Sequence, residues 1–138
     1  ERMKMRAEHR VPLSRQAMQV LEAMRPISGD HELVFPSPTY RSKPLSENTF
    51  NAALRRMGYD TATAHGFRSL FSTVTNEHDR TLGDVVERAL AHQDRNKVRA
   101  SYLRSTFLND RVRLMQWWAD YLDGRKAGNV VPLLQRVA

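Results

Sequence analysis

The sequence predicts a mainly α-helical domain with a small β element at its N-terminal end. Apolar residues recur at helical spacing in several segments, each bounded by residues typical of helix ends. Residues 1–12 are predicted to be extended, and Pro12 closes this stretch because it cannot donate a hydrogen bond to a strand ladder. With 138 residues the chain is long enough for one domain with its own core.

The first two helices are predicted from end signals and from one apolar face each. The first follows Ser14, a good N-cap residue, and is stopped by Pro26 and Gly29. Its apolar face consists of Leu13, Ala17, Val20, Leu21 and Met24. A loop rich in Pro and Ser is predicted over 36–44, and the second helix is capped by Ser46 and ended by Gly58. The apolar face of the second helix consists of Phe50, Ala53, Leu54 and Met57.

Two further helices are predicted in the middle of the chain. One spans about 66–78 and is expected to bury Phe67, Leu70, Phe71 and Val74. The next begins at the Thr81-x-x-Asp84 signal, and His92 lies at its end. Its inward face is expected to consist of Leu82, Val85, Val86, Ala89 and Leu90.

The C-terminal part is predicted to hold one or two helical turns over 96–104 and a long helix over 109–125. The apolar stripe of the long helix consists of Leu114, Trp117, Trp118, Tyr121 and Leu122. The two tryptophans are therefore expected in the core rather than as platforms for bases. The apolar tail 129–138 could pack on its own domain or on a neighbouring molecule.

Composition favours a polyanionic partner without proving one. The chain carries 22 Lys and Arg against 15 Asp and Glu, a formal net charge of +7. Such a surplus steers nucleic acids toward a protein, although a merely basic surface would look the same. Cysteine is absent, which excludes disulfides and thiolate metal sites. We expect no signal peptide and no membrane-spanning segment.

Five residues suit attack on a phosphodiester: Lys4, His65, Arg68, His92 and Tyr102. A tyrosine hydroxyl, with a pKa near 10, is a weak nucleophile that needs nearby positive charge or a base. Arginine donates two parallel hydrogen bonds to phosphate oxygens, and histidine can donate a hydrogen bond or hold a proton. A lysine beside other cations can protonate the leaving oxygen. No metal or other cofactor is required by this scheme.

The spacing of these residues resembles that of the tyrosine recombinases of the phage integrase family. Thr-Ala-His-Gly-Phe-Arg-Ser at 63–69 is similar to the family's His-x-x-Arg box, and Leu-Ala-His at 90–92 to its Leu-(Gly/Ala)-His signature. Tyr102 follows ten residues later, and Lys4 stands eight residues before Pro12, as in the family's β-hairpin. The resemblance covers residues 4–128 and is greatest to integrases of satellite phages, prophages and genomic islands.

The resemblance implies a DNA breaking-rejoining fold and a role for each residue. Tyr102 would form a 3′-phosphotyrosyl link to DNA, and Arg68 and His92 would stabilise the transition state. His65 would accept a proton or orient another group, and Lys4 would protonate the leaving 5′-oxygen. The implied function is integration or excision of a mobile element at double-stranded attachment sites by a homo-tetramer in the bacterial cytoplasm, at the nucleoid.

One family motif has no counterpart in this sequence. The family has a further catalytic arginine, in a Thr-Gly-x-Arg setting upstream of the hairpin lysine. Residues 1–128 are therefore expected to form the C-terminal part of a catalytic domain, incomplete at its N-terminus, and 129–138 is the candidate for the segment that docks on a neighbour in this family. By itself this chain is expected to be inactive or nearly so. Relaxation of DNA by a type IB topoisomerase and DNA binding without cleavage are the alternative functions.

A second group of residues is predicted to contact the DNA backbone. These residues are Arg41, Lys43, Asn48, Asn51, Arg55, Arg95, Lys97 and Arg99. For each one taken alone an ordinary solvated side chain is the safer interpretation, and only the set as a whole favours DNA contact. Lys4 also fits a solvated strand lysine, and His92 fits a helix C-terminal residue stabilised by the dipole, a role compatible with catalysis.

Overall fold

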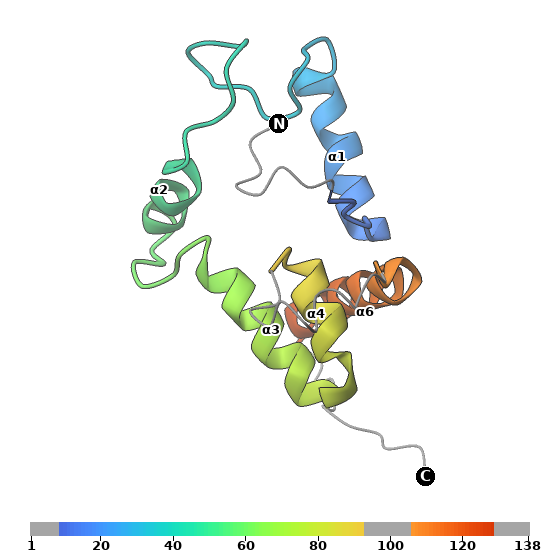
Figure 1. The fold of residues 1–138 in the computed structure, drawn as a ribbon. Coiled ribbons are helices and arrows are strands. Elements are labelled where there is room, and N and C mark those ends of the chain that lie inside the picture. Colours follow the sequence, from blue (N-terminus) through green and yellow to red (C-terminus); the bar gives the residue numbers. More distant parts are fainter. Residues whose placement is uncertain (1–8, 93–105, 129–138) are drawn as a thin grey trace. The chain divides into compact units, whose positions relative to one another are not determined.

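The structure, a computed structural model, describes residues 9–92 and 106–128 (Figure 1). The chain forms two compact units, one of Arg15–Thr73 and one that combines Glu1–Ser14 with Val74–Ala138. The regular elements in the described ranges are helical, which confirms the mainly α prediction. They are α1 (Arg15–Ser28), α2 (Thr49–Arg56), α3 (Gly66–His78), the 3-10 helix η1 (Arg80–Leu82), α4 (Gly83–Ala89) and α6 (Leu108–Lys126).

The predicted N-terminal strand is not found where the chain is described. Residues 9–14 have no regular secondary structure, and residues 1–8 lie outside the described part. A strand needs a partner for its backbone groups, and here the Arg10 carbonyl accepts a hydrogen bond from Arg111 Nη1 at 2.8 Å instead. Within the described ranges, β pairing is limited to a bridge between Pro36 and Pro44, which closes the predicted loop.

In the unit Arg15–Thr73, helix α1 begins after Ser14 as predicted, but Pro26 lies inside its last turn. The prediction that Pro26 stops the helix was wrong. The helix continues because the N–H of Gly29 donates to the Arg25 carbonyl at 2.8 Å. The buried Ser28 hydroxyl then donates to the Val34 carbonyl at 2.6 Å, which turns the chain back. The apolar face was also partly misjudged, since Leu13 and Val20 are exposed whereas Ala17, Leu21 and Met24 are half-buried.

Helix α2 is shorter at its start than predicted and ends where predicted. Its N-cap is Asn48 rather than Ser46. At its other end Gly58 has a φ of 85°. The N–H of Gly58 donates to the Arg55 carbonyl at 2.9 Å and that of Tyr59 to the Leu54 carbonyl at 3.0 Å. This is the Schellman arrangement that favours glycine. Of the predicted apolar face, Phe50 and Met57 are exposed, and Ala53 and Leu54 are half-buried.

The core of the other unit is built from α4, α6 and the end of α3. Val85, Val86 and Leu90 are buried, as predicted for α4, and so is Leu114 of α6. Helices α4 and α6 pack against each other. The start of this segment differs from the prediction, because Asp79 rather than Thr81 is the capping residue. The Asp79 carboxylate accepts from the Thr81 hydroxyl at 2.7 Å and from its N–H at 2.8 Å.

Aromatic rings join α3 to α6. His78 at the end of α3 stacks on Trp117 with ring centroids 4.3 Å apart. Tyr121 stacks on both Trp117 and Trp118, at 5.6 and 5.5 Å. These rings are half-buried, in keeping with the predicted core role of the tryptophans, whereas Leu122 is exposed. Helix α6 spans one residue more at each end than the predicted 109–125.

Candidate functional site

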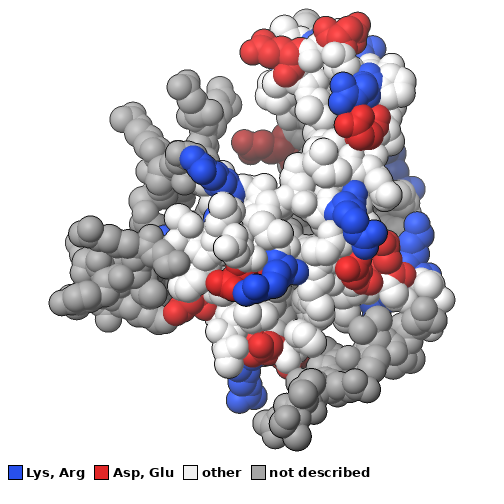
Figure 2. All heavy atoms as spheres, turned by 90° about the vertical axis from the view of Figure 1, so that its right-hand side faces the viewer, with Lys and Arg blue, Asp and Glu red and all other residues white. Residues whose placement is uncertain are grey.

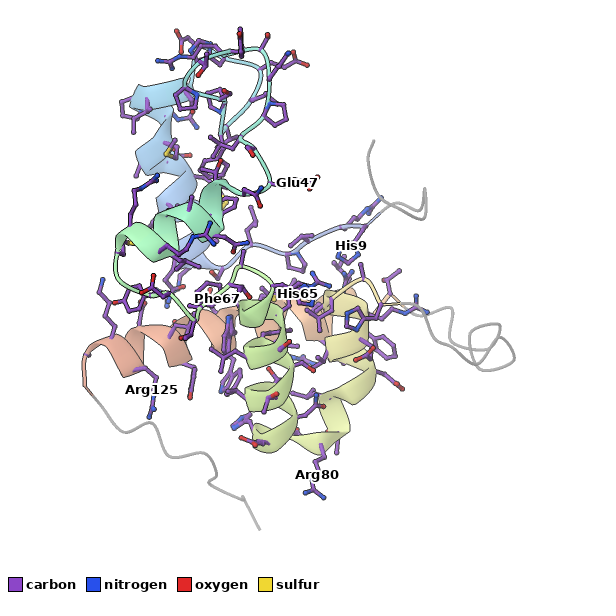
Figure 3. The ribbon with its side chains drawn as sticks, turned by 90° about the vertical axis from the view of Figure 1, so that its left-hand side faces the viewer. His9, Glu47, His65, Phe67, Arg80 and Arg125 are labelled. Carbon is purple, nitrogen blue, oxygen red and sulfur yellow. The ribbon has the colours of Figure 1, made fainter. Side chains whose placement is uncertain are left out.

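The His-x-x-Arg box lies at the start of α3, in the unit Arg15–Thr73. Figure 3 shows His65 and Phe67 at the first turn of this helix. His65 directly precedes the helix, and its carbonyl accepts from the N–H of Arg68 at 3.0 Å. Both side chains belong to exposed residues. The box therefore stands at a helix N-terminus, where partial positive charge favours a phosphate.

Two side chains fix the turn that precedes this helix. Thr63 Oγ1 accepts from the N–H of Gly66 at 3.0 Å. Asn51 Oδ1, which comes from α2, accepts from the N–H of Ala64 at 2.8 Å. A β-carbon at Gly66 would lie 3.2 Å from Thr63 Oγ1, so a larger residue there would press on this turn. The position of His65 thus depends on Asn51 and Thr63.

The predicted packing of α3 was only partly right. Phe71 is buried and Val74 is half-buried, but Phe67 and Leu70 are 55% and 46% exposed. Thr75 is fully buried instead. The two exposed apolar residues flank Arg68 and leave its helical turn open to solvent.

His92 belongs to the other unit and follows the C-terminus of α4. The N–H of His92 donates to the Glu87 carbonyl at 2.9 Å, and the N–H of Ala91 to the Arg88 carbonyl at 3.2 Å. Ala91 has a φ of 54°, the left-handed conformation that usually favours glycine. This geometry explains why glycine suits the middle of a Leu-(Gly/Ala)-His signature, with alanine as the smallest residue that carries a β-carbon.

The ring of His92 is held by a carboxylate of the same helix. Its Nδ1 lies 3.0 Å from Glu87 Oε2, and the two side chains are about half exposed, at 48% and 54%. This contact leaves Nε2 as the ring nitrogen available to a substrate. Which nitrogen of a histidine carries its proton is set by the partner of the other.

The remaining predicted catalytic residues, Tyr102 and Lys4, lie outside the described residues, as do the predicted DNA contacts Arg95, Lys97 and Arg99. Of the described catalytic candidates, His65 and Arg68 share one unit, and His92 belongs to the other. The roles given to all five residues stay predictions.

The other predicted DNA contacts come from α2 and from the loop before it. Arg41, Lys43, Asn48 and Arg55 are exposed, and Asn51 is half-buried. The Lys43 ammonium lies 5.0 Å from the ring centroid of Tyr40, and Arg41 Nη1 is 3.4 Å from His31 Nε2. Their role as DNA contacts stays a prediction, and the Asn51 oxygen is already the acceptor of the Ala64 N–H.

Positive and negative side chains are interspersed on the visible face of the molecule (Figure 2). On the face drawn in Figure 2, Lys and Arg stand among Asp and Glu rather than in one continuous patch. In the described parts of the chain, no group of three His, Asp or Glu residues could hold a metal ion. The described helices include none that is both long and apolar enough to cross a bilayer.

Comparison with known proteins identifies the class of protein. Residues 1–109 match the phage integrase family. The chain is 52% identical over 125 residues to the integrase of Enterobacteria phage P4, which covers 88% of this chain and 28% of that protein. It is 46% identical over 131 residues to the prophage integrase IntA of Escherichia coli K12, with 94% and 32% covered.

The similarity extends to the integrase of Shigella phage Sf6, which is 38% identical over 126 residues, 88% of this chain and 32% of that protein. No solved structure gives a significant match to this chain. The chain belongs to the phage integrase family, as the resemblance predicted, and is similar to prophage integrases. It spans less than a third of the length of these three relatives.

Three residues that shape the site were not assigned these roles from the sequence. Glu87 and Thr63 were given no individual role, and Asn51 was predicted to contact DNA. Thr63 precedes the helix start by three residues, a spacing typical of hydroxyl capping, and could have been found. The Glu87–His92 pair depends on the left-handed Ala91, which no periodic pattern reveals.

Proposed function

We propose that this chain is the part of a site-specific DNA recombinase that carries its nucleophile, and that it acts in integration or excision of a mobile element. The observation that carries the proposal is the family match, which includes the His65–Arg68 box and the Leu-Ala-His signature in order. The geometry supports it, because the box opens a helix and His92 is oriented by Glu87.

In this proposal the Tyr102 oxygen attacks a DNA phosphorus, and the bond from phosphorus to the 5′-oxygen breaks. The tyrosine proton passes to His65, and Lys4 gives a proton to the leaving 5′-oxygen. Arg68 and His92 donate hydrogen bonds to the non-bridging oxygens, whose charge increases in the transition state. The product is a 3′-phosphotyrosyl link and a free 5′-hydroxyl.

The second step reverses the first with a different strand. The 5′-hydroxyl of the partner strand attacks the phosphotyrosine, and Tyr102 leaves as a phenol that regains its proton. One phosphodiester is exchanged for another, so no nucleotide cofactor is needed. Recombination then requires paired double-stranded attachment sites, for which a homo-tetramer with the tail 129–138 docked on a neighbour is the proposed assembly.

A nicked DNA substrate that loses its 5′-hydroxyl fragment tests the nucleophile. The protein should be the longer integrase that contains this sequence, because the Thr-Gly-x-Arg motif has no counterpart here. We expect covalent protein–DNA complexes on denaturing gels for the unaltered protein, and none for Tyr102→Phe. Tyr59→Phe, at a 60% exposed tyrosine, is the matched control and should trap DNA normally. Covalent trapping by Tyr102→Phe would disprove the assignment.

A strand-exchange assay on paired sites, run beside a plasmid-relaxation assay, separates the alternative functions. The integrases among the relatives favour recombination over simple relaxation of supercoils. A recombinase should exchange strands between paired sites of one sequence, whereas a type IB topoisomerase relaxes plasmids without such a pair. For the 138-residue chain alone we expect DNA binding with little or no covalent trapping, because the catalytic arginine of the Thr-Gly-x-Arg motif has no counterpart in it.

A further inference from the structure

A cavity in the unit that contains α4 and α6 is lined by positive groups. It has a volume of about 390 Å³, and its described lining residues are His9, Arg10, Arg88, Thr106, Leu108 and Arg111. Three of these six are arginines and none is acidic. Figure 3 labels His9, which stands on the N-terminal segment of this unit. None of the described reaction residues, His65, Arg68 and His92, lines this cavity.

Arg111 is the residue that makes this cavity unusual. Only 4% of it is exposed to solvent. Its Nη1 donates to the Arg10 carbonyl at 2.8 Å, but its Nε meets no hydrogen-bond acceptor where the chain is described. A guanidinium stays protonated in proteins, and a buried charge without a counterion is costly. No carboxylate ion pair of Arg111 occurs among the described residues, whereas its neighbour Arg113 pairs with Asp110.

The start of helix α6 adds to this positive field. Leu108 is the first residue of the 19-residue helix, and Thr106 and Phe107 precede it. Phe107, the N-cap residue, has a φ of 47° and makes no side-chain hydrogen bond to the helix. Backbone N–H groups in the first turn of a helix lack helical acceptors and carry partial positive charge. Arg111 belongs to this same first turn.

From the buried Arg111 and the uncapped start of α6 together, we propose that this cavity binds a phosphate group, held by residues other than His65, Arg68 and His92. A tetrahedral oxyanion can accept from a guanidinium, a hydroxyl and backbone N–H groups on separate oxygens, whereas a halide offers a single atom to all of them. It also supplies the negative charge that Arg111 lacks. The group is a phosphodiester of the DNA backbone or a free phosphate.

Titration of inorganic phosphate into the 138-residue chain tests the site. Ionic strength is held constant with chloride, and binding is followed by calorimetry. We expect saturable binding of one phosphate, weakened about tenfold or more by Arg111→Gln, because a hydrogen bond to a charged group is lost. Arg113→Gln is the matched control on α6, with a side chain 78% exposed, and should bind phosphate as before.

Two outcomes would overturn the proposal: no saturable phosphate binding by the unaltered chain, or unchanged affinity in folded Arg111→Gln. If Arg111→Gln does not fold, Thr106→Val and Arg88→Gln take its place. Each replaces a hydrogen-bond donor among the residues that line the cavity. Unchanged phosphate affinity in both would also overturn it. None of these measurements involves DNA cleavage, so they are independent of whether Tyr102 is a nucleophile.

A second arm identifies the source of the phosphate and assumes that the chain binds DNA, as proposed above. Binding of a short duplex is measured at several salt concentrations. If a backbone phosphate occupies the cavity, inorganic phosphate competes with DNA, and Arg111→Gln lowers the salt slope by about one. If the site takes free phosphate, DNA affinity and salt slope are unchanged by Arg111→Gln. Either result supports the site and names its ligand.

Discussion

Glu87 Oε2 lies 3.0 Å from His92 Nδ1, so that a carboxylate of α4 holds the imidazole that follows the same helix. The contact is made possible by Ala91, whose left-handed backbone turns the chain back over the last turn of α4. Because the carboxylate occupies Nδ1, the nitrogen that can exchange a proton or a hydrogen bond with a substrate is Nε2. Glu87 is therefore a positioning residue for His92.

Replacing Glu87 by Gln should lower the rate of covalent complex formation about three- to tenfold in the longer integrase. The side chains are half exposed, so the loss is smaller than the hundredfold or more typical of removing an acid or base itself. Nitrogen NMR of His92 should show a changed balance of its two tautomers. Glu77→Gln, at an exposed glutamate of α3, is the control. An unaltered tautomer balance in Glu87→Gln would contradict the positioning role.

Replacing Ala91 by Gly should stabilise the chain. A left-handed conformation costs an alanine about 1–2 kcal/mol, and glycine avoids this cost but loses more entropy on folding. We expect the free energy of unfolding to rise by about 0.5–1 kcal/mol, measured by urea denaturation. Ala89→Gly, two residues earlier inside α4, should instead lower it by about 1 kcal/mol. A loss of stability in Ala91→Gly as well would show that the conformation at residue 91 is unstrained.

Removing the Asp79 cap should destabilise the chain in a pH-dependent way. Hydrogen bonds from the Thr81 hydroxyl and from its backbone N–H hold the pKa of Asp79 below its ordinary value of 3.8. Asp79→Ala should lower the free energy of unfolding by about 1 kcal/mol at neutral pH. A depressed folded-state pKa stabilises the fold above the ordinary value, and this stabilisation is lost as the pH falls through the depressed value.

The difference between Asp79→Ala and the unaltered chain should therefore be constant above pH 5 and shrink below about pH 4. Urea denaturation at a series of pH values measures it. Asp84→Ala lies in the first turn of α4 and is the comparison for charge at this helix start. A difference that persists unchanged down to pH 2 would mean that the carboxylate charge contributes nothing to the cap.

The sequence predicted those features that depend on local patterns. The bounds of α3 follow from its apolar spacing, and Gly58 ends α2 because only a positive φ completes the Schellman turn. Val85, Val86 and Leu90 were found because α4 has one apolar face. The catalytic candidates came from ordered motifs and from the resemblance that they carry. Their roles, unlike the family, still await experiment.

The predictions that were wrong concern features that depend on contacts between residues far apart in the sequence. Periodicity places Phe67 and Leu70 on an apolar face but does not show what covers them, and both are exposed. Arg111 occurs in a charged stretch of the sequence, where a solvated side chain would be expected. It is buried instead, and its guanidinium donates to the carbonyl of Arg10, 101 positions earlier. Pro26 lies in the last turn of α1, where its missing N–H costs only one helical hydrogen bond, and the Gly29 N–H still closes the helix on the Arg25 carbonyl.

Asn51 and Asn48, both predicted to contact DNA, should respond differently to replacement by alanine. Asn51→Ala removes the acceptor of the Ala64 N–H, a half-buried hydrogen bond of 2.8 Å. We expect the free energy of unfolding to fall by about 1 kcal/mol, and DNA cleavage by the longer integrase to fall with it, because the turn that carries His65 loosens. Asn48 is exposed and makes no side-chain cap, so Asn48→Ala should leave stability within about 0.5 kcal/mol.

The two variants also separate a structural role from a DNA contact. If Asn51 acts through the turn, its alanine variant should bind DNA with nearly normal affinity at low temperature, where the fold is intact, and should still cleave slowly. Amide exchange should rise at Ala64, whose N–H has lost its acceptor, and stay unchanged in Asn48→Ala. A stable Asn51→Ala protein with unaltered exchange at Ala64 but weakened DNA binding would instead assign the amide to DNA, and the turn before α3 would then be held by Thr63 alone.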